Sequence, residues 1–225
     1  VSNMSTITWI GEGPSPEEIC IGFSSGEIAV GRIGQDHGRT LKIGDDSPVT
    51  GVAFSRQHVA VATTTSLIIW EFDGKYLKSP SFQLLRAMGV HNIIGIWATA
   101  SGSFVAIAGS DGLIFVDPKS QESFTYSGTF SRLAKLDDNS FIAARRSDGL
   151  AKIKINNSEI EMRQLTLGNT LDFIDVCYLK RGVCVLTNRN IICFKSIDQY
   201  YPMFVVDLEK HVVPFRVMPL GNHLT

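Results

Sequence analysis

Three arginines have the clearest capacity for chemistry in this sequence, since Arg145, Arg146 and Arg189 lie in short polar segments between apolar runs. A guanidinium group binds a carboxylate or a phosphate through two parallel hydrogen bonds, so clustered arginines often form a docking site. Polar segments elsewhere in the chain contain further charged or titratable residues: Asp45, Asp46, His91 and Asp111. We predict that these seven residues share one partner-binding face.

A purely local arrangement of the arginines is the alternative. Arg145 or Arg146 would then pair with Asp148 or Asp172 at the surface. A solvated ion pair of this kind contributes little to stability, because water screens both charges. The sequence leaves both arrangements open.

Motifs for nucleotide binding and zinc-dependent hydrolysis are missing, since GxGxxG, GxxxxGK[ST] and HExxH have no match. Two carboxylates could hydrolyse a glycosidic bond if they lay about 5–10 Å apart. The acidic residues expected on inner strands are Glu12, Asp172 and Asp175. We expect a protein without catalysis, and we assign no catalytic, cofactor-binding or metal-binding residue. The alternative is a carbohydrate-binding or glycoside-processing protein.

Charge and hydropathy narrow the classes of partner. The chain has 225 residues, 44% of them hydrophobic, and its 21 Lys and Arg residues nearly balance 22 Asp and Glu residues. Nucleic acid and anionic membranes attract proteins with a concentrated basic face, so we expect neither as a partner. Insertion into a membrane is not expected either, because no apolar run reaches the 18 residues that a span needs. Protein partners remain.

Four cysteines, at positions 20, 177, 184 and 193, lie among apolar neighbours in segments that we expect to be strands. None of them forms a CxxC pair, so we expect buried, reduced thiols that pack as small hydrophobic groups. A zinc site or a disulfide is the alternative. Reduced thiols are typical of a reducing compartment, and we therefore predict a cytoplasmic protein.

A repeat of about 40 residues positions the polar segments. A turn residue followed by a short apolar strand recurs at Gly26, Ser66, Gly112, Gly149 and Asn190, with spacings of 40, 46, 37 and 41 residues. Glycine or asparagine at this position suits a tight hairpin that needs a positive φ. Four short strands in each period predict an all-β fold, a β-propeller with about five blades.

The repeat places five blades in one domain, residues 1–225. Their ranges are 5–44, 48–87, 93–128, 130–167 and 172–208, and residues 212–218 read as the first strand of a further blade. Residues 72–81 are expected to form an extended loop. Either five blades close a ring, or the chain is truncated at its C-terminus and belongs to a ring of six to eight blades. Further sequence or another chain would then complete the ring.

The second unit, residues 48–75, resembles the WD-repeat family. Its segments PVTGVAFS and LIIWEFDGK are similar to that family's first and third strands, with Trp70-Glu71 in place of Trp-Asp. The third unit keeps an Asp-Gly turn at Asp111-Gly112 and has His91 near the family's Gly-His position. The resemblance implies a non-catalytic scaffold that binds other proteins, as part of a larger polypeptide or complex.

Overall fold

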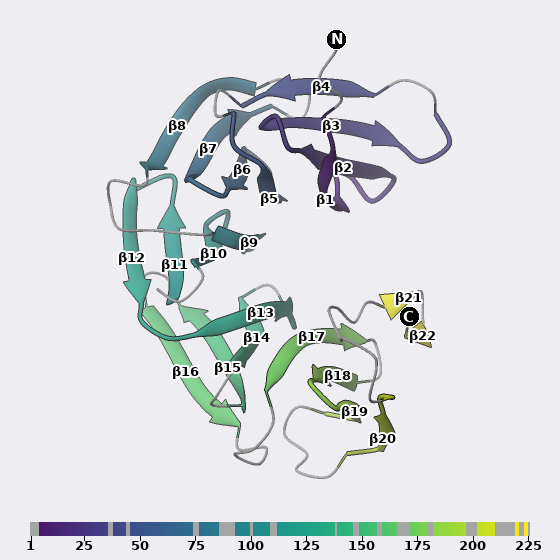
Figure 1. The fold of residues 1–225 in the computed structure, drawn as a ribbon. Coiled ribbons are helices and arrows are strands. Elements are labelled where there is room, and N and C mark those ends of the chain that lie inside the picture. The colour runs from purple at the N-terminus through teal and green to yellow at the C-terminus, as the bar shows by residue number, and fades with distance from the viewer. Residues whose placement is uncertain are drawn as a thin grey trace. The chain divides into compact units, whose positions relative to one another are not determined.

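The computed structural model is all-β in the part of the chain that it describes (Figure 1). That part comprises residues 5–35, 38–43, 46–73, 77–85, 93–99, 101–108, 112–137, 139–145, 149–156, 159–165, 172–179, 182–196, 202–209, 219–220 and 223–224. Five antiparallel sheets of four strands follow one another along the chain. The prediction of five four-stranded units is confirmed.

Each sheet is a meander whose strands pair in sequence order. Sheet 1 contains β1 (Ile7–Glu12), β2 (Glu18–Phe23), β3 (Glu27–Arg32) and β4 (Arg39–Lys42). Sheet 2 contains β5 (Val49–Phe54), β6 (His58–Thr63), β7 (Ser66–Phe72) and β8 (Leu77–Leu85), and sheet 3 contains β9 (Ile93–Ala98), β10 (Phe104–Ala108), β11 (Gly112–Asp117) and β12 (Glu122–Tyr126). Sheet 4 contains β13 (Phe130–Lys135), β14 (Ser140–Arg145), β15 (Gly149–Asn156) and β16 (Glu159–Leu165). Sheet 5 contains β17 (Phe173–Leu179), β18 (Gly182–Thr187), β19 (Asn190–Phe194) and β20 (Phe204–Asp207).

Two segments differ from the sequence-based expectation. The loop predicted over residues 72–81 is wrong, because β7 continues to Phe72 and β8 already begins at Leu77. Pro80 lies inside β8, which is the last strand of its sheet, and an edge strand tolerates the missing N–H. A short hairpin of β21 (Pro219–Leu220) and β22 (His223–Leu224) was not foreseen. The strand predicted over 212–218 lies outside the described residues.

The turns between second and third strands are of two kinds. Gly26, Gly112 and Gly149 have φ values of 76°, 121° and 82°, which confirms the left-handed conformation predicted for these turns. Ser66 and Asn190 do not have a positive φ, so the positive φ expected for asparagine at this position is wrong for Asn190. A threonine hydroxyl organises the backbone there instead.

Sheets 2 and 5 share this threonine-based turn. Thr63 Oγ1 accepts the backbone N–H groups of Thr65 and Ser66 over 3.2 and 2.9 Å. Thr187 Oγ1 accepts those of Arg189 and Asn190 over the same two distances. Side-chain oxygens of serine and threonine often close turns in this way, which removes the need for glycine.

A hydroxyl group also links sheet 1 to sheet 2. β1 has a β-bulge at Thr8, between the paired residues Ile7 and Trp9. Thr8 Oγ1 lies 3.2 Å from the carbonyl oxygen of Gly22 in its own sheet and 2.8 Å from that of Val49 in sheet 2. Since a bulge redirects a side chain, it aims this hydroxyl at the neighbouring sheet. We call the arrangement a hydroxyl clamp.

Ser131 forms the same clamp between sheets 4 and 5. It lies at the bulge of β13, and its Oγ is 3.1 Å from the carbonyl oxygen of Ala144 and 2.8 Å from that of Phe173. We expect Ser131→Ala to lower the free energy of unfolding by about 1 kcal/mol, because a partly buried carbonyl loses its donor. Urea denaturation measures this, with the exposed Ser127→Ala as the control. Equal stability of both variants would show that the clamp contributes nothing.

Consecutive sheets pack face to face within each part of the chain. We call the side of a sheet that packs on the preceding sheet its trailing face, and the other side its leading face. In sheet 2 the trailing face carries Val49, Val52, Val59 and Val61, which form one buried cluster with residues of the leading face of sheet 1. The contact is close, since a Cβ added to Gly22 would lie 2.5 Å from Val49 Cγ1.

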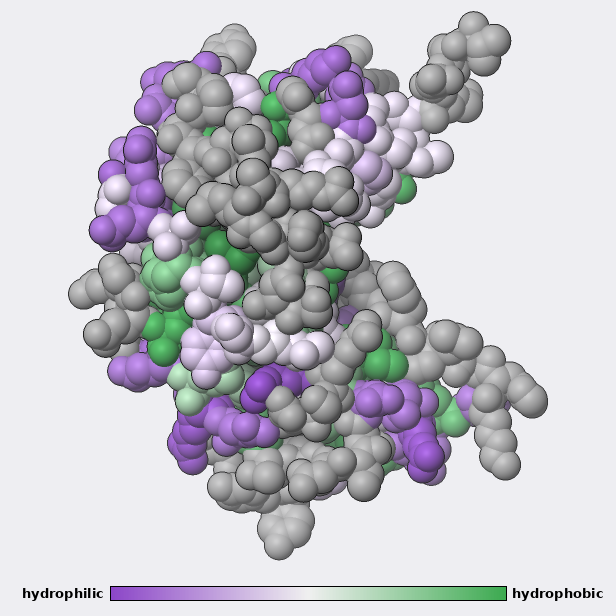
Figure 2. Space-filling view, turned by 60° about the vertical axis from the view of Figure 1, so that its left-hand side comes forward, coloured by the Kyte–Doolittle hydropathy of each residue, from purple (hydrophilic) through white to green (hydrophobic). Residues whose placement is uncertain are grey.

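The chain divides into two compact units, Val1–Ser127 with sheets 1–3 and Gly128–Thr225 with sheets 4 and 5. Sheets 2 and 3 share a further buried cluster in the first unit, and sheets 4 and 5 share one in the second. Outer strands such as β12 are largely exposed. On the face drawn in Figure 2, hydrophilic and intermediate residues cover more of the coloured surface than hydrophobic ones do. The prediction that residues 1–225 form a single domain stays a prediction.

Candidate interaction site

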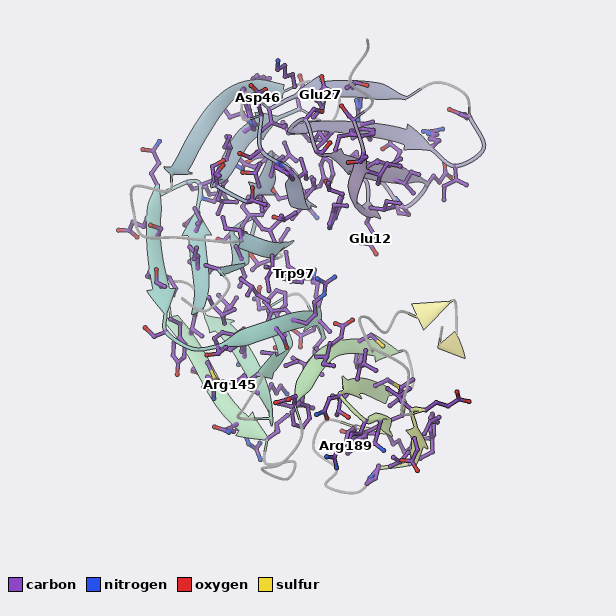
Figure 3. All side chains as sticks on the ribbon, viewed as in Figure 1. Glu12, Glu27, Asp46, Trp97, Arg145 and Arg189 are labelled. Atoms are coloured by element: carbon purple, nitrogen blue, oxygen red, sulfur yellow. A yellow bond between two sulfur atoms is a disulfide. The ribbon has the colours of Figure 1, made fainter. Side chains whose placement is uncertain are left out.

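Three residues of the predicted partner-binding face lie in the described part of the chain: Arg145, Arg189 and Asp46. The other four lie outside it: Arg146, Asp45, His91 and Asp111. Arg145 and Arg189 belong to the second unit and Asp46 to the first. Figure 3 labels the three described residues.

Arg189 lies on the threonine-based turn between β18 and β19, and its side chain is exposed. Thr187 is completely buried, and its Oγ1 accepts the N–H of Arg189. The Arg189 carbonyl accepts the N–H of Leu208 over 2.8 Å, and the Asn190 side-chain amide donates to the Asp207 carboxylate. The backbone that carries this guanidinium is thus fixed on both sides, which lowers the entropy lost when a partner binds.

Arg145 ends β14 and is partly buried. Its guanidinium carbon lies 5.6 Å from the ring centroid of Phe130, within the range of a cation–π contact. Nη1 also donates to Gln164 Oε1 at 3.4 Å. These contacts hold the side chain against its own sheet, so Arg145 is the more rigid of the two arginines and Arg189 the more accessible.

The two arginines lie at the same edge of the second unit. Arg145 pairs with Phe130 at the start of β13, and Thr187 pairs with Phe173 at the start of β17. The Ser131 clamp joins these two strand starts directly. Consequently the C-terminal ends of β14 and β18 lie at the same edge of the second unit. Arg145 and Arg189 therefore lie at this edge, and the partner-binding face itself stays a prediction.

Asp46 is highly exposed and lies beside one basic group of its own sheet. Its Oδ1 is 3.9 Å from Lys42 Nζ, and the two side chains are 88% and 69% exposed. A pair so exposed contributes little to stability. Its proposed place opposite the arginines stays a prediction.

The two acidic residues expected near the start of sheet 5, Asp172 and Asp175, lie in different environments. Asp175 is 3% exposed, and its Oδ1 lies 3.5 Å from Arg132 Nε and accepts the N–H of Val176. Asp172 is exposed at the entrance to β17. Asp175 is therefore engaged in a buried ion pair between sheets 4 and 5, which disfavours the glycoside-processing alternative.

Residues 22–26 read GFSSG and match the GxSxG motif of serine hydrolases. The segment runs from the end of β2 through the turn into β3. Ser24 Oγ accepts the backbone N–H of Thr6 at 3.1 Å. A nucleophile elbow requires a strand, a sharp turn and a helix, whereas this serine lies in a hairpin between two strands. The match thus carries no catalytic assignment.

No group of three or more His, Cys, Asp or Glu side chains that could hold a metal ion occurs among the described residues. A search of the same residues finds no helix with the length and hydropathy to cross a membrane.

Three cysteines stand opposite one another on adjacent strands of sheet 5. Cys177 pairs with Cys184, and Cys184 pairs with Cys193. Cys184 and Cys193 form a disulfide, with their Cα atoms 4.2 Å apart, so the expectation of four reduced thiols is wrong for this pair. Directly opposed residues of an antiparallel pair approach this closely, and only the register reveals it.

Cys20 and Cys177 are free and buried. Burial raises the pKa of Cys20 to about 12, and burial together with the nearby Asp175 carboxylate raises the pKa of Cys177 to about 11. At pH 8 a thiol of pKa 11 is ionised in roughly one molecule per thousand. We expect neither to react with iodoacetamide in the native state and both to react after guanidinium unfolding, as mass spectrometry can measure. Rapid native alkylation would contradict the described burial.

Several exposed hydrophobic side chains were not predicted from the sequence. Ile7 and Ile10 on β1 are 56% and 55% exposed, and Ile33 in the turn after β3 is 76% exposed. Four consecutive exposed residues lie at the outer edge of sheet 5: Met203, Phe204, Val205 and Val206. The alternation of apolar and polar residues along a strand could not identify them. It predicts which side chains share a face of the sheet, and not whether anything covers that face.

Comparison with known proteins identifies the architecture. No protein-family model matches the chain, and no curated protein matches it either. A solved structure, the crystal structure of RRP9 WD40 repeats, matches 85% of this chain with a TM-score of 0.66 and 12% sequence identity. The fold is a WD-repeat-like β-propeller. Each four-stranded sheet is a blade, and the chain spans 63% of the matched structure, less than two thirds of its length. At this identity the likeness shows the fold alone.

The WD-like motif has a structural use in this propeller. Trp70 packs against the cluster between sheets 1 and 2. Its Nε1 is buried and has no hydrogen-bond partner in the described part of the chain. In sheet 2 the tryptophan therefore acts as an apolar packing residue.

Proposed function

We propose that this chain is a non-catalytic scaffold for protein–protein interactions, built on a WD-repeat-like propeller and part of a larger polypeptide or complex. The fold supports this proposal, because propellers present turns and loops on a rigid frame. The observation that carries it is the exposed Arg189, held on a buried threonine turn at the same edge as Arg145. The surface would take an acidic protein segment.

Chemical complementarity defines that segment. An arginine guanidinium pairs with carboxylate or phosphate through two hydrogen bonds, and neighbouring arginines bind such groups more specifically than a lysine would. Arg146 follows Arg145 directly and would add a third guanidinium. Asp45, Asp46, His91 and Asp111 belong to the same proposed face and would contact basic or neutral parts of the partner.

The cytoplasm remains our proposed compartment. The Cys184–Cys193 disulfide is an argument against this compartment, because disulfides persist mainly in oxidising compartments. Thiol blocking at the moment of cell lysis, followed by non-reducing mass spectrometry, would show whether the bond exists in the cell.

Arg189→Glu tests the binding edge. We expect purified tagged protein with this change to recover at least about tenfold less of the partners that the unchanged chain recovers from its own cells, since one charge reversal at a desolvated contact costs more than 1.4 kcal/mol. Lys195→Glu is the matched control, because it makes the same charge change at an exposed residue beyond the other end of β19. Equal loss in both variants, or no loss in either, would contradict the proposal.

A further inference from the structure

Sheet 5 carries three cysteines in one row across its first three strands (Figure 1). Cys177 on β17 is directly opposite Cys184 on β18, and Cys184 is directly opposite Cys193 on β19. Opposed residues of antiparallel strands lie on the same face of the sheet, so Cys184 is the middle member of the row. It is bonded to Cys193, whereas Cys177 is a free thiol. A thiol therefore lies on the other side of the middle sulfur from its bonded partner.

The spacing of the row allows Cys184 to bond to either neighbour. Cα atoms of directly opposed residues are about 4.5–5.5 Å apart, and most disulfides span about 4.4–6.8 Å. Burial and the Asp175 carboxylate raise the pKa of Cys177, and a hydrogen bond from the Cys184 backbone lowers it in part. That hydrogen bond places the Cys177 sulfur beside Cys184. Cys177 and Cys193 lie two strand spacings apart, about 9–10 Å, which is too far for a direct bond.

Burial restricts the chemistry of this row to the three sulfurs themselves. Cys177, Cys184 and Cys193 are 6%, 2% and 3% exposed, and Leu186 belongs to the same buried cluster. A dissolved thiol or oxidant would have to displace this packing before it reached a sulfur. An internal nucleophile needs no such opening, and a group held beside its target reacts as if it were present at very high concentration.

We propose that these cysteines form a thiol–disulfide exchange site, in which Cys184 bonds alternately to Cys193 and to Cys177. The Cys177 thiol loses its proton, and the thiolate attacks the Cys184 sulfur from the side opposite Cys193. The Cys177–Cys184 bond forms while the Cys184–Cys193 bond breaks, and Cys193 leaves as a thiolate that takes up a proton. One disulfide and one thiol are present before and after, so the step needs no oxidant or reductant.

The high pKa of Cys177 makes this exchange slow without preventing it. Burial and the Asp175 carboxylate raise that pKa to about 11, so roughly one molecule per thousand carries the thiolate at pH 8. A thiolate of high pKa is also the stronger nucleophile, which offsets part of the loss. Uncatalysed disulfide rearrangement takes minutes to hours, and we expect the exchange on this timescale.

Exchange moves a covalent cross-link from one pair of strands to another. The Cys184–Cys193 bond closes the hairpin of β18 and β19, whose turn carries Arg189. A bond to Cys177 instead joins β18 to β17, the strand that receives the Ser131 clamp from sheet 4. After the exchange, hydrogen bonds and packing alone hold the hairpin together. The site thus sets how firmly the Arg189 turn is held.

Tryptic mapping of the full chain tests the exchange. Trypsin cleaves after Lys180, Arg189 and Lys195, so each of the three cysteines falls on its own peptide. The purified chain is held at pH 8 without reductant for several hours. Its free thiols are then blocked with N-ethylmaleimide while it unfolds in mild acid, and mass spectrometry quantifies the linked peptides.

Two linked pairs of peptides are expected. Most molecules should carry the Cys184–Cys193 link, and about 0.1–10% should carry the Cys177–Cys184 link, the usual range for a minor state. Links to Cys20 measure scrambling during the work-up, because Cys20 is buried in the cluster between sheets 1 and 2. A Cys177–Cys184 link below about 0.1%, or no more frequent than links to Cys20, would overturn the proposal.

Serine variants test the assignment of Cys184 as the shared sulfur. In Cys193→Ser, refolded in a glutathione redox buffer, we expect Cys177 and Cys184 to join, with oxidised glutathione taking up the two electrons and two protons. Cys184→Ser is the matched control, because Cys177 and Cys193 are not on neighbouring strands and should both remain thiols. Two free thiols in the first variant, or a bond between Cys177 and Cys193 in the second, would contradict the assignment.

Hydrogen exchange measures the structural consequence. Cys177→Ser locks the bond within the β18–β19 hairpin, and Cys193→Ser locks it between β17 and β18. We expect β19 amides to exchange at least about tenfold faster in Cys193→Ser, and β17 amides in Cys177→Ser, because a covalently closed loop resists local opening. Equal rates in the two variants would overturn this consequence. Arg189→Glu must leave the bond pattern unchanged, so the exchange succeeds or fails independently of the proposed acidic partner.

Discussion

Phe173→Ala is expected to lower the free energy of unfolding by about 3–5 kcal/mol, the usual range for removing a fully buried phenylalanine. Phe173 is 1% exposed and belongs to the cluster that joins sheets 4 and 5, which includes Ala144 and Leu150. The alanine variant keeps the Phe173 carbonyl that receives the Ser131 clamp. The loss therefore reports packing between the two sheets and not the hydrogen bond.

Urea denaturation monitored by circular dichroism measures this change. Phe204→Ala is the matched control, because Phe204 lies in β20 of the same sheet and is 46% exposed. We expect the control to cost less than about 1 kcal/mol, since much of its side chain already contacts water. Similar losses in the two variants would contradict the packing of sheet 5 on sheet 4.

Asp175→Ala is expected to lower the free energy of unfolding by about 2 kcal/mol. Removing one partner of a fully buried ion pair costs about 3–5 kcal/mol, because the other charge is left without compensation. Arg132 is 24% exposed on its side chain, so water can solvate part of the guanidinium and reduce the loss. The Val176 N–H also loses the carboxylate oxygen that it donates to.

Asp172→Ala provides the comparison for Asp175, since Asp172 is an exposed aspartate three residues earlier in the chain. We expect a change of at most about 0.5 kcal/mol, as for most surface substitutions. A double variant in which Arg132→Met accompanies Asp175→Ala should recover part of the loss, because no unpaired charge then remains. If Asp175→Ala left stability unchanged but removed a glycoside-hydrolysing activity, the ion pair would have a catalytic role and the scaffold proposal would be wrong.

The repeat made the fold predictable, because turn residues and the alternation of apolar and polar residues are local signals. Each of them marks a single strand and does not depend on contacts between sheets. Glycine at positions 26, 112 and 149 correctly indicated left-handed turns. Asn190 does not have the positive φ that its residue type suggested, because the threonine three positions earlier organises this turn, as it does at Ser66. Pro80 likewise suggested a loop, because the sequence does not say which strand lies at an edge.

Contacts between sheets were much harder to predict. Arg132 and Asp175 are 43 residues apart, and their pairing depends on how β13 and β17 pack. Cys184 and Cys193 became neighbours through a hairpin register that a one-residue slip would have destroyed. Arg145 and Arg189 lie at one edge of the second unit because Arg145 ends β14 and Arg189 follows β18, the equivalent strand of the adjacent sheet.

The hydroxyl clamps affect how cooperatively the propeller unfolds when it is destabilised. Thr8 couples sheet 1 to sheet 2 and Ser131 couples sheet 4 to sheet 5, each inside one compact unit. Sheets 2 and 3 have no such clamp, because the hydroxyl of Thr50, at the bulge of β5, has no hydrogen-bond partner in the described part of the chain. In a linear array of repeats, the cooperativity of unfolding depends on coupling between neighbours. We therefore expect sheets that share a clamp to unfold together, as one cooperative block.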